Sequence, residues 1–204
     1  MVKVEFIIPT ATDPLALFDS WLAEARAIEQ PPDPLIASFA TVTPSGDPAV
    51  RLMRMIEFRH GELLFRSYSD TPKGRDIAAH PAVALSFQWR KSGRNVRING
   101  VTRPITAIEA DAAWAAMPRP VQVSTAGRAI ISRAVAGIDE IMARIEACDR
   151  EFPGEVPRPE CWGGWWITPL LIEFWCSHEQ MLHERVEFSR TGAAGSWAVR
   201  RLCA

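Results

Sequence analysis

Residues 35–68 read LIASFATVTPSGDPAVRLMRMIEFRHGELLFRSY, three apolar runs separated by two short polar breaks. The breaks, PSGDP and RHG, contain the glycine, aspartate and proline residues that tight turns require. Short runs with turn residues between them are typical of antiparallel strands. The segment therefore predicts strands over 35–42, 49–58 and 62–68.

Two further runs continue this pattern. AVALSFQW (82–89) and NVRINGVTRPI (95–105) are separated by KSGR, another turn signal. One helical insert, TPKGRDIAAH (71–80), interrupts the series and has Pro72 near its first turn. The regular spacing of short strands predicts an antiparallel sheet or barrel.

Helices are predicted on both sides of these strands. Asp13-Pro14 places a capping side chain before a proline, and apolar residues then recur at helical spacing to about Glu29. Helical patterns also run over 108–116 and 137–152. The tail returns to strands, with the runs WWITP, LLIEFW, MLHERVEF and SWAVRRL. The expected fold class is mainly β, a β-barrel with peripheral helices.

The 204 residues fit one domain, and no internal repeat or linker divides them. The expected parts of this 1–204 domain are an N-terminal helical arm (1–33), a barrel core (34–105), helices (106–152) and C-terminal strands (160–204). A net charge of −1 provides no general field for nucleic acid or an anionic membrane. No apolar run approaches the roughly 20 residues of a membrane span, and no secretion signal is evident. The four widely spaced cysteines favour a reducing cytoplasm.

The tail segment IEFWCSHEQMLHERVEF (172–188) invites a metal-site interpretation. His178 and His183 are five residues apart, whereas a zinc-protease helix needs a spacing of four. A spacing of five turns the second side chain by roughly 140° on a helix, and places it on the opposite face of a strand. We predict no metal site here. The Rossmann, phosphate-loop, hydrolase-elbow and zincin motifs are also absent from the sequence.

Basic residues near strand and helix ends are the remaining candidates for ligand binding. Arg51 and Arg54 have an odd spacing within one strand, so at most one can point into a given site. The run Asp70-Thr71-Pro72-Lys73-Gly74-Arg75 places hydroxyl, ammonium and guanidinium groups at a helix N-terminus. Free backbone N–H groups and the positive dipole end favour a phosphate there.

Taken in order, these pieces resemble the pyridoxine/pyridoxamine 5'-phosphate oxidase family of flavoproteins. The matching pieces are Arg51, P-K-G-R-D (72–76), N-V-R-I-N-G (95–100), P-R-P-E-C-W-G-G-W (157–165), I-E-F-W (172–175), L-H-E-R (182–185) and W-A-V-R-R-L (197–202). The resemblance runs from about Pro34 to Leu202 and is weaker around 117–135. It implies an FMN-binding split β-barrel that binds non-covalent FMN at a homodimer interface. A hydride would pass from a small heteroaromatic substrate to the flavin, which O2 reoxidises.

The resemblance also implies roles for individual residues. Arg51 and Lys73 would meet the phosphate region of FMN, and Asn95 keeps the amide of a family glutamine. His183 matches a substrate-side residue. The full cofactor-binding set is Arg51, Ser67, Lys73, Asn95, Trp175 and Arg185. Because the cofactor supplies most of the chemistry in such a scaffold, no catalytic general base is assigned.

Departures from the family pattern concern mainly the substrate side. Ile56 stands where the family has a lysine, Pro72 replaces a basic residue, and Ala129-Ile130 occupies the place of a Gln-Ser pair. The family's substrate-phosphate donors are replaced by apolar residues, namely Ala113, Met117, Val121 and Met181. The expected substrate-binding set is therefore His183, Met181, Met117, Val121 and Ile56. A buried phosphate without donors is strongly penalised, so we expect a flat, more apolar substrate without a phosphate. Phenazine-biosynthesis flavin oxidases fit this expectation better than a vitamin B6 oxidase.

Alternatives remain for both the function and the residues. A flavin-binding protein without oxidase activity would also fit the loss of the lysine at Ile56. A genuine pyridoxamine phosphate oxidase would need other phosphate donors, such as Arg119 or Arg128. Trp175 could be a core residue, and Arg185 could form a surface ion pair with Glu184 or Glu187. The set Ala113, Met117 and Val121 could also be core.

Overall fold

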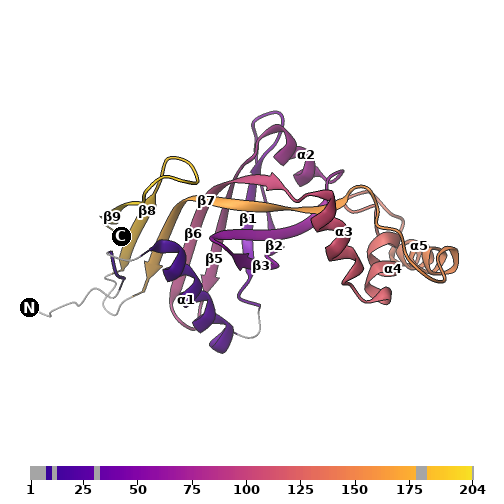
Figure 1. Ribbon diagram of the computed structural model, residues 1–204, viewed down its shortest axis with the longest axis horizontal. Coiled ribbons are helices and arrows are strands. Elements are labelled where there is room, and N and C mark those ends of the chain that lie inside the picture. The colour runs from indigo at the N-terminus through magenta and orange to yellow at the C-terminus, as the bar shows by residue number, and fades with distance from the viewer. Residues whose placement is uncertain (1–7, 11–12, 30–32, 178–182, 204) are drawn as a thin grey trace, which may run out of the picture.

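A computed structural model describes residues 8–10, 13–29, 33–177 and 183–203, and shows one curled antiparallel sheet with helices around it (Figure 1). The helices are α1 (Pro14–Ile28), α2 (Pro72–Ala79), α3 (Ala107–Ala115), α4 (Arg119–Gly127) and α5 (Ile138–Glu151). The strands are β1 (Ile36–Val42), β2 (Pro48–Arg54), β3 (Glu57–Arg59), β4 (Glu62–Tyr68), β5 (Ala82–Trp89), β6 (Arg94–Pro104), β7 (Trp162–Cys176), β8 (Glu184–Ser189) and β9 (Ala198–Leu202). The predicted mainly β class is confirmed.

The strand order is β2-β1-β5-β6-β7-β4-β3, and β8 pairs with both β7 and β9. The predicted single strand over 49–58 is wrong, because it divides into β2 and β3 at Met55–Ile56. The backbone N–H of Met55 donates to the Leu35 carbonyl, and that of Ile56 donates to the Leu64 carbonyl. Strands β2 and β3 stand at the two ends of the strand order, so Met55 and Ile56 connect one edge of the curled sheet to the other.

The longest strand, β7, runs along the long axis of the molecule from the α3–α5 end to the β8–β9 end (Figure 1). It pairs with β6 along its length, with β4 through its first part, and with β8 through its last part. The sequence predicted two strands, WWITP and LLIEFW, and Pro169 is the last residue of the first run. Pro169 instead lies opposite Gly100, beside a register shift in the β6–β7 ladder. A proline is tolerated at such a bulge because its missing N–H interrupts no regular ladder bond.

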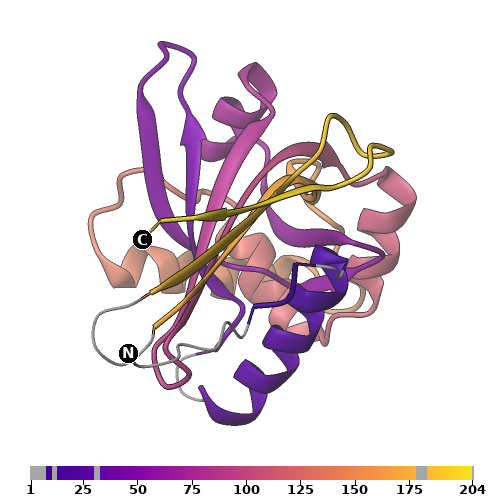
Figure 2. The same cartoon turned by 90° about the vertical axis from the view of Figure 1, so that its left-hand side faces the viewer.

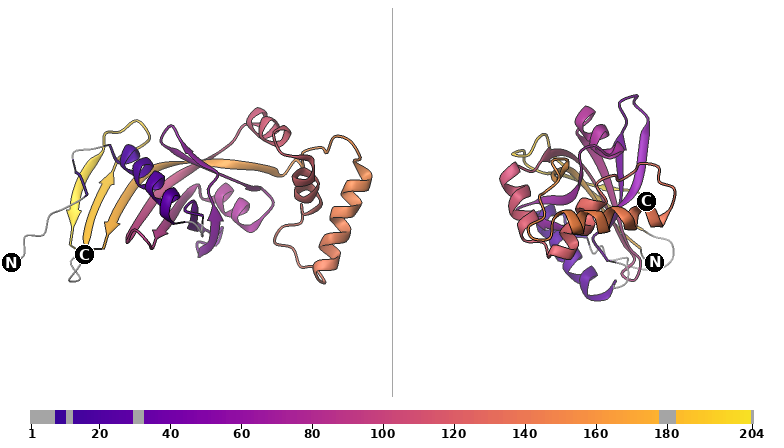
Figure 3. Two further views of the ribbon diagram at one scale, coloured as in Figure 1. Left: turned by 90° about the horizontal axis from the view of Figure 1, so that it is seen from below. Right: turned by 90° about the vertical axis from the view of Figure 1, so that its right-hand side faces the viewer.

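Helix α1 covers the concave face of the sheet (Figures 2 and 3). It begins as predicted, with the Asp13 side chain accepting a hydrogen bond from the Leu15 N–H. Its buried Phe18 lies 4.9 Å from Phe58 between ring centroids, and its Trp21 lies 5.1 Å from Phe174. These edge-to-face aromatic contacts fill the inner side of the barrel. On the opposite face of β6 and β8 lie polar side chains such as Asn95, Arg97 and Arg185.

A second, smaller core lies beside the start of β7. There the rings of Trp114 and Trp162 meet edge to face at 5.0 Å, and the Trp114 indole donates to the Val156 carbonyl. Helix α4 was not predicted, because two prolines and mixed polarity hide its periodicity in PRPVQVSTAG. The helical pattern over 137–152 agrees with α5, whose Ile138 is 67% exposed. In the described chain, no helix is long and apolar enough to span a membrane.

Candidate functional site

Arg51 and Lys73 come together where β2 passes the start of α2. Arg51 points inward and Arg54 outward, as their odd spacing predicted. One Arg51 nitrogen donates to the Thr41 hydroxyl at 2.6 Å, and the other lies 3.4 Å from the Asp76 carboxylate. Lys73 reaches the Thr71 hydroxyl at 3.5 Å, next to the α2 N-terminus. Two cations and a helix N-terminus thus converge on one place.

The electrostatics of this place favour an anion. Burial, together with the positive charge of Arg51, lowers the pKa of Lys73. Asp76 is buried and accepts a short hydrogen bond from the Thr41 hydroxyl, so its carboxylate is engaged by Thr41 and Arg51. The surroundings of Lys73 therefore disfavour its positive charge. A phosphate group would stabilise both cations and would lie at the positive end of the α2 dipole.

Asn95, Trp175 and Arg185 lie side by side on the polar face of the sheet. Asn95 is the register partner of Trp175, which in turn is the partner of Arg185. The His183 ring lies 4.8 Å from the Trp175 ring, and its buried Nδ1 has no hydrogen-bond partner within the described chain. Trp175 is only half-buried, so it is not a simple core residue. The structure therefore brings four of the predicted residues together.

Arg185 is held in place by a buried carboxylate. Its guanidinium contacts Glu173 at 3.0 and 3.3 Å, and this hydrogen bonding raises the pKa of Arg185. Arg97 donates to the same carboxylate at 2.9 Å. The predicted alternative, a direct ion pair of Arg185 with Glu184 or Glu187, is wrong because Glu173 is the direct partner. Glu173 therefore accepts hydrogen bonds from two arginines beside Trp175, and Arg97 also lies 3.9 Å from Glu187.

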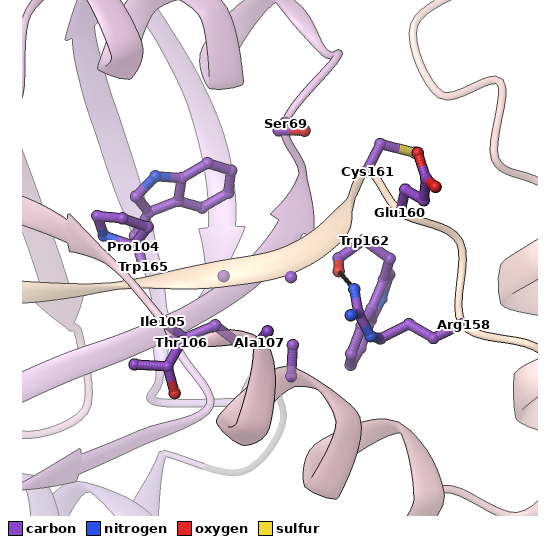
Figure 4. A pocket seen from close by; sticks show the side chains of 13 residues that line it. Ser69, Pro104, Ile105, Thr106, Ala107, Arg158, Glu160, Cys161, Trp162 and Trp165 are labelled. Carbon is purple, nitrogen blue, oxygen red and sulfur yellow. Dashed lines mark hydrogen bonds between the residues drawn. The ribbon is translucent and has the colours of Figure 1, made fainter.

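A cavity of about 260 Å³ lies where β6 has ended and α3 begins (Figure 4). Trp165, Gly163 and Ser69 line it, with Arg158 and Cys161 on the far side. Arg158 is paired with Asp111 at 2.7 Å and donates to the Trp162 carbonyl at 2.9 Å. Burial raises the pKa of the Cys161 thiol, which disfavours a reactive thiolate.

Ser67 and Asn95 are tied closely to the sheet. Ser67 is buried on β4, opposite Gly163, and so lies next to the cavity wall. The Asn95 amide nitrogen donates to the Ser86 hydroxyl at 3.1 Å and to the Phe87 carbonyl at 2.7 Å. These bonds fix the orientation of the amide on the polar face. The assigned cofactor roles of both residues stay predictions.

The substrate-side residues divide into two groups. Ile56, Ala113, Met117 and Val121 lie around α3, α4 and the β3–β4 hairpin, where Ala113 lines a second cavity of about 330 Å³. Met117 and Ala113 pack partly against the second core, while Val121 is 46% exposed. His183 lies at the other end, beside Trp175, and Met181 lies outside the described residues. Sequence reasoning missed Arg66, a charged residue in the apolar run ELLFRSY, which lines the second cavity.

The two groups are far apart within one chain. Gly164 is the register partner of Arg66, and Trp175 follows eleven residues later on the same strand. At about 3.3 Å per residue, these positions are roughly 35 Å apart along β7. One chain therefore cannot bring both groups around a single flat ligand. Two copies of the chain could do so.

Two family models match the chain. One, described as pyridoxamine 5'-phosphate oxidase, matches residues 23–142, and the other, described as the pyridoxine 5'-phosphate oxidase C-terminal dimerisation region, matches residues 162–204. A pyridoxine/pyridoxamine 5'-phosphate oxidase from Bradyrhizobium diazoefficiens is 41% identical, covering 94% of this chain and 90% of that protein. One of the same description from Rhodopseudomonas palustris is 40% identical, with the same coverage.

Solved structures share the fold. The structure of PhzG from Burkholderia lata, in complex with tetrahydrophenazine-1-carboxylic acid, has a TM-score of 0.86 at 22% identity and covers 98% of this chain and 99% of its own. A pyridoxamine 5'-phosphate oxidase-related, FMN-binding protein from Nostoc punctiforme has a TM-score of 0.75 at 14% identity, covering 95% and 99%. These likenesses extend over nearly the whole length of each protein. At these identities they establish a common fold.

Proposed function

The chain belongs to the pyridoxamine 5'-phosphate oxidase family, and from that premise we propose that it is an FMN-dependent oxidase of a small, flat heteroaromatic compound without a phosphate group. The observation that carries the cofactor proposal is the pair of cations at the start of α2. Arg51 and Lys73 lie together there, with burial and Arg51 lowering the pKa of Lys73. This arrangement suits a phosphate monoester such as that of FMN.

The second part of the proposal is a homodimer with FMN at its interface. The C-terminal dimerisation region of the family covers Trp175, Arg185 and His183. These residues lie roughly 35 Å along β7 from the cavity at Ala113. We assign the flavin ring and the substrate to a site that combines the α2–α3 end of one chain with the β7–β8 face of its partner.

The third part concerns the substrate. Ala113, Met117 and Val121 offer no donor to a phosphate dianion, and the two alternative donors are engaged elsewhere. Arg119 is paired with Asp149 at 2.6 Å, and the Arg128 Nε donates to the Ser124 carbonyl. The tricyclic acid bound by the structurally similar PhzG is a compound of the proposed class.

Within this site, the protein's part is binding and orientation. FMN, when bound, would accept a hydride and pass electrons to O2. Arg51 and Lys73 would hold its phosphate, and Arg185, fixed by Glu173, would present positive charge to the flavin. Trp175 and His183 offer flat rings against which an aromatic substrate can be positioned, and the His183 Nδ1 is available for a hydrogen bond.

A second candidate function is oxidation of pyridoxine or pyridoxamine 5'-phosphate. The 41% identity to a relative of that description favours it. The apolar residues at the substrate-phosphate positions oppose it, because each lost charged donor would weaken phosphate binding severely.

The test of the proposed function is direct. Purified protein should be yellow and release FMN on heating, and anaerobic addition of a reduced phenazine carboxylic acid should bleach the flavin. Readmitting O2 should restore the colour. Colourless protein that takes up no FMN would refute the cofactor proposal. Bleaching by pyridoxamine 5'-phosphate alone would select the second candidate, and bleaching by no compound of either class would indicate a flavin-binding protein without oxidase activity.

Lys73→Met should weaken FMN binding while leaving the FMN-free protein at least as stable. Because its pKa is lowered in the folded protein, the charged Lys73 side chain destabilises the FMN-free fold at any pH below that lowered pKa. The destabilisation disappears as the pH rises from the lowered pKa to the ordinary pKa of lysine, and methionine removes it at every pH. Loss of a charged phosphate contact should weaken FMN about 10- to 100-fold. Fluorescence titration measures the affinity, and thermal unfolding measures the stability.

The matched control is Arg75→Met on the same helix. Arg75 is exposed, and its guanidinium donates to the Asp70 carbonyl. It should leave FMN affinity within about twofold, since exposed charges contribute little. Equal effects of the two substitutions would show that Lys73 has no special role.

A further inference from the structure

The cavity of about 330 Å³ lies between α3 and the strands β3, β4 and β7. Its apolar walls include Leu64, Ile105, Ala113 and Trp166. Ala112 and Ala113 face it from α3, and their small side chains leave room for a flat ring. Ile56 adjoins it through the hydrogen bond from its N–H to the Leu64 carbonyl at 2.7 Å.

Four charged side chains line this cavity, and three of them have internal partners. Glu109 accepts a hydrogen bond from the Thr106 N–H at 2.7 Å and one from the Trp166 indole at 3.2 Å, and the pKa of this carboxyl is lowered by these bonds. Glu57 and Arg59 form an ion pair at 3.5 Å. These three groups are therefore accounted for within the chain.

Arg66 is different. Its buried Nε has no hydrogen-bond partner, and the guanidinium makes no ion pair with any residue that the structure describes. The group lies over the Trp162 ring at 5.9 Å from the centroid. A buried N–H group without an acceptor is costly, so an arginine in this state, facing a cavity, calls for a ligand acceptor.

The chemistry of the cavity limits what that ligand is. A guanidinium offers a planar fork that matches the two oxygens of a carboxylate. Of the four charged side chains that line the cavity, Arg66 alone lacks a partner among the described residues, and its single positive charge suits a carboxylate monoanion better than a phosphate dianion, which would need further donors. Trp166 and the alanines of α3 suit an aromatic ring attached to the carboxylate.

We propose that Arg66 binds the carboxylate of the substrate, and that it sets the specificity of the site for a carboxylated heteroaromatic compound. This inference rests on the proposed function, because it assigns the substrate class of the same site. It adds a cationic anchor to a substrate side for which the sequence predicted His183 and four apolar residues.

The experiment compares three probes on the FMN-bound protein: phenazine-1-carboxylate, phenazine and pyridoxal 5'-phosphate. Binding is followed by changes in flavin absorbance. Wild-type protein should bind the carboxylate about tenfold or more tightly than phenazine, the effect of one charged hydrogen-bonded contact. Arg66→Met should abolish that preference and leave phenazine affinity within about twofold. Arg66→Lys keeps the positive charge but loses the planar guanidinium, so it should retain part of the preference for the carboxylate over phenazine.

Arg103→Met is the matched control. Arg103 is paired with Glu62 at 2.7 Å and lies over the Trp166 ring, but it does not line the cavity. It should keep the wild-type preference for the carboxylate. An unchanged preference in Arg66→Met, or tighter binding of pyridoxal 5'-phosphate than of the carboxylate by wild-type protein, would overturn the proposal.

FMN content separates failure of this inference from failure of the proposed function. Wild-type protein and Arg66→Met should hold equal FMN, and loss of FMN in the variant alone would assign Arg66 to the cofactor and overturn the proposal. Wild-type protein that holds no FMN would refute the proposed function instead. In that case, binding of the three probes to FMN-free protein would be followed by tryptophan fluorescence, since Trp166 lines the cavity. A preference for phenazine-1-carboxylate over phenazine that Arg66→Met abolishes would still support the role of Arg66, and an unchanged preference would overturn it.

Discussion

Mixing Lys73→Ala and Arg185→Ala proteins should restore sites of wild-type FMN affinity, which neither variant forms alone. Lys73 lies at the start of α2, and Arg185 lies on the β7–β8 face. If a site takes the first group from one chain and the second from its partner, a mixed dimer contains one intact site and one doubly altered site. Homodimers of either variant contain two damaged sites.

The expected recovery follows from random reassociation. Half of the dimers are mixed and half of their sites are intact, so about one quarter of wild-type FMN binding should return. The two proteins are unfolded together, refolded and mixed with FMN at a concentration that fills wild-type sites but few of the weakened ones, and bound flavin per chain is measured. Each variant refolded separately supplies the baseline.

The matched control is a mixture of Lys73→Ala and Arg51→Ala. Arg51 and Lys73 both lie at the start of α2 and would be contributed to a site by the same chain. Every site of a mixed dimer has therefore lost one of the two cations, and no recovery is expected. Recovery in this control, or none in the Lys73 and Arg185 mixture, would contradict the shared site.

Gly74→Ala should destabilise the protein and damage the anion site. A Cβ at this position would lie 2.3 Å from the Ser69 carbonyl oxygen, a backbone atom that cannot move aside alone. Helix propensity predicts the opposite, because alanine is favoured over glycine by about 1 kcal/mol in a helix. We expect the clash to exceed that gain, with a net loss of about 2 kcal/mol.

Thermal unfolding tests this expectation. In a domain of this size, such a loss should lower Tm by roughly 4–8 °C. FMN affinity should also fall, because Gly74 donates its N–H to the capping hydroxyl of Thr71. The control is Gly137→Ala, where nothing lies within 4 Å of the added Cβ, and Tm should stay nearly unchanged. A higher Tm for Gly74→Ala would show that propensity outweighs the close contact.

Local patterns in the sequence predicted most of the elements. The runs 35–42, 62–68 and 82–89 agree with β1, β4 and β5 to within a residue, since alternation and turn chemistry are local properties. The break at Met55–Ile56 and the continuity of β7 across Pro169 were missed. Both depend on the pairing of strands that are distant in sequence, which no local window contains.

The candidate site divides in the same way. The helix-start chemistry at Lys73 was readable from adjacent residues, and the ordered motifs added Arg51, Trp175 and Arg185. That Glu173 holds Arg185 could not be read, because the contact requires the register of β7 and β8. Arg66 was visible only as a charge in an apolar strand. Its lack of a partner became evident from the packing of α3 against β4 and β7.

The position of β7 also has a consequence for how the chain folds. This strand joins β6, β4 and β8, yet it begins only at residue 162. Its pairing of Leu63 with Ile167 joins positions about a hundred residues apart, a source of high contact order and slow folding. A nascent chain leaving the ribosome therefore exposes the edges of β4 and β6 until most of the 204 residues have been made, and in that interval it is open to aggregation.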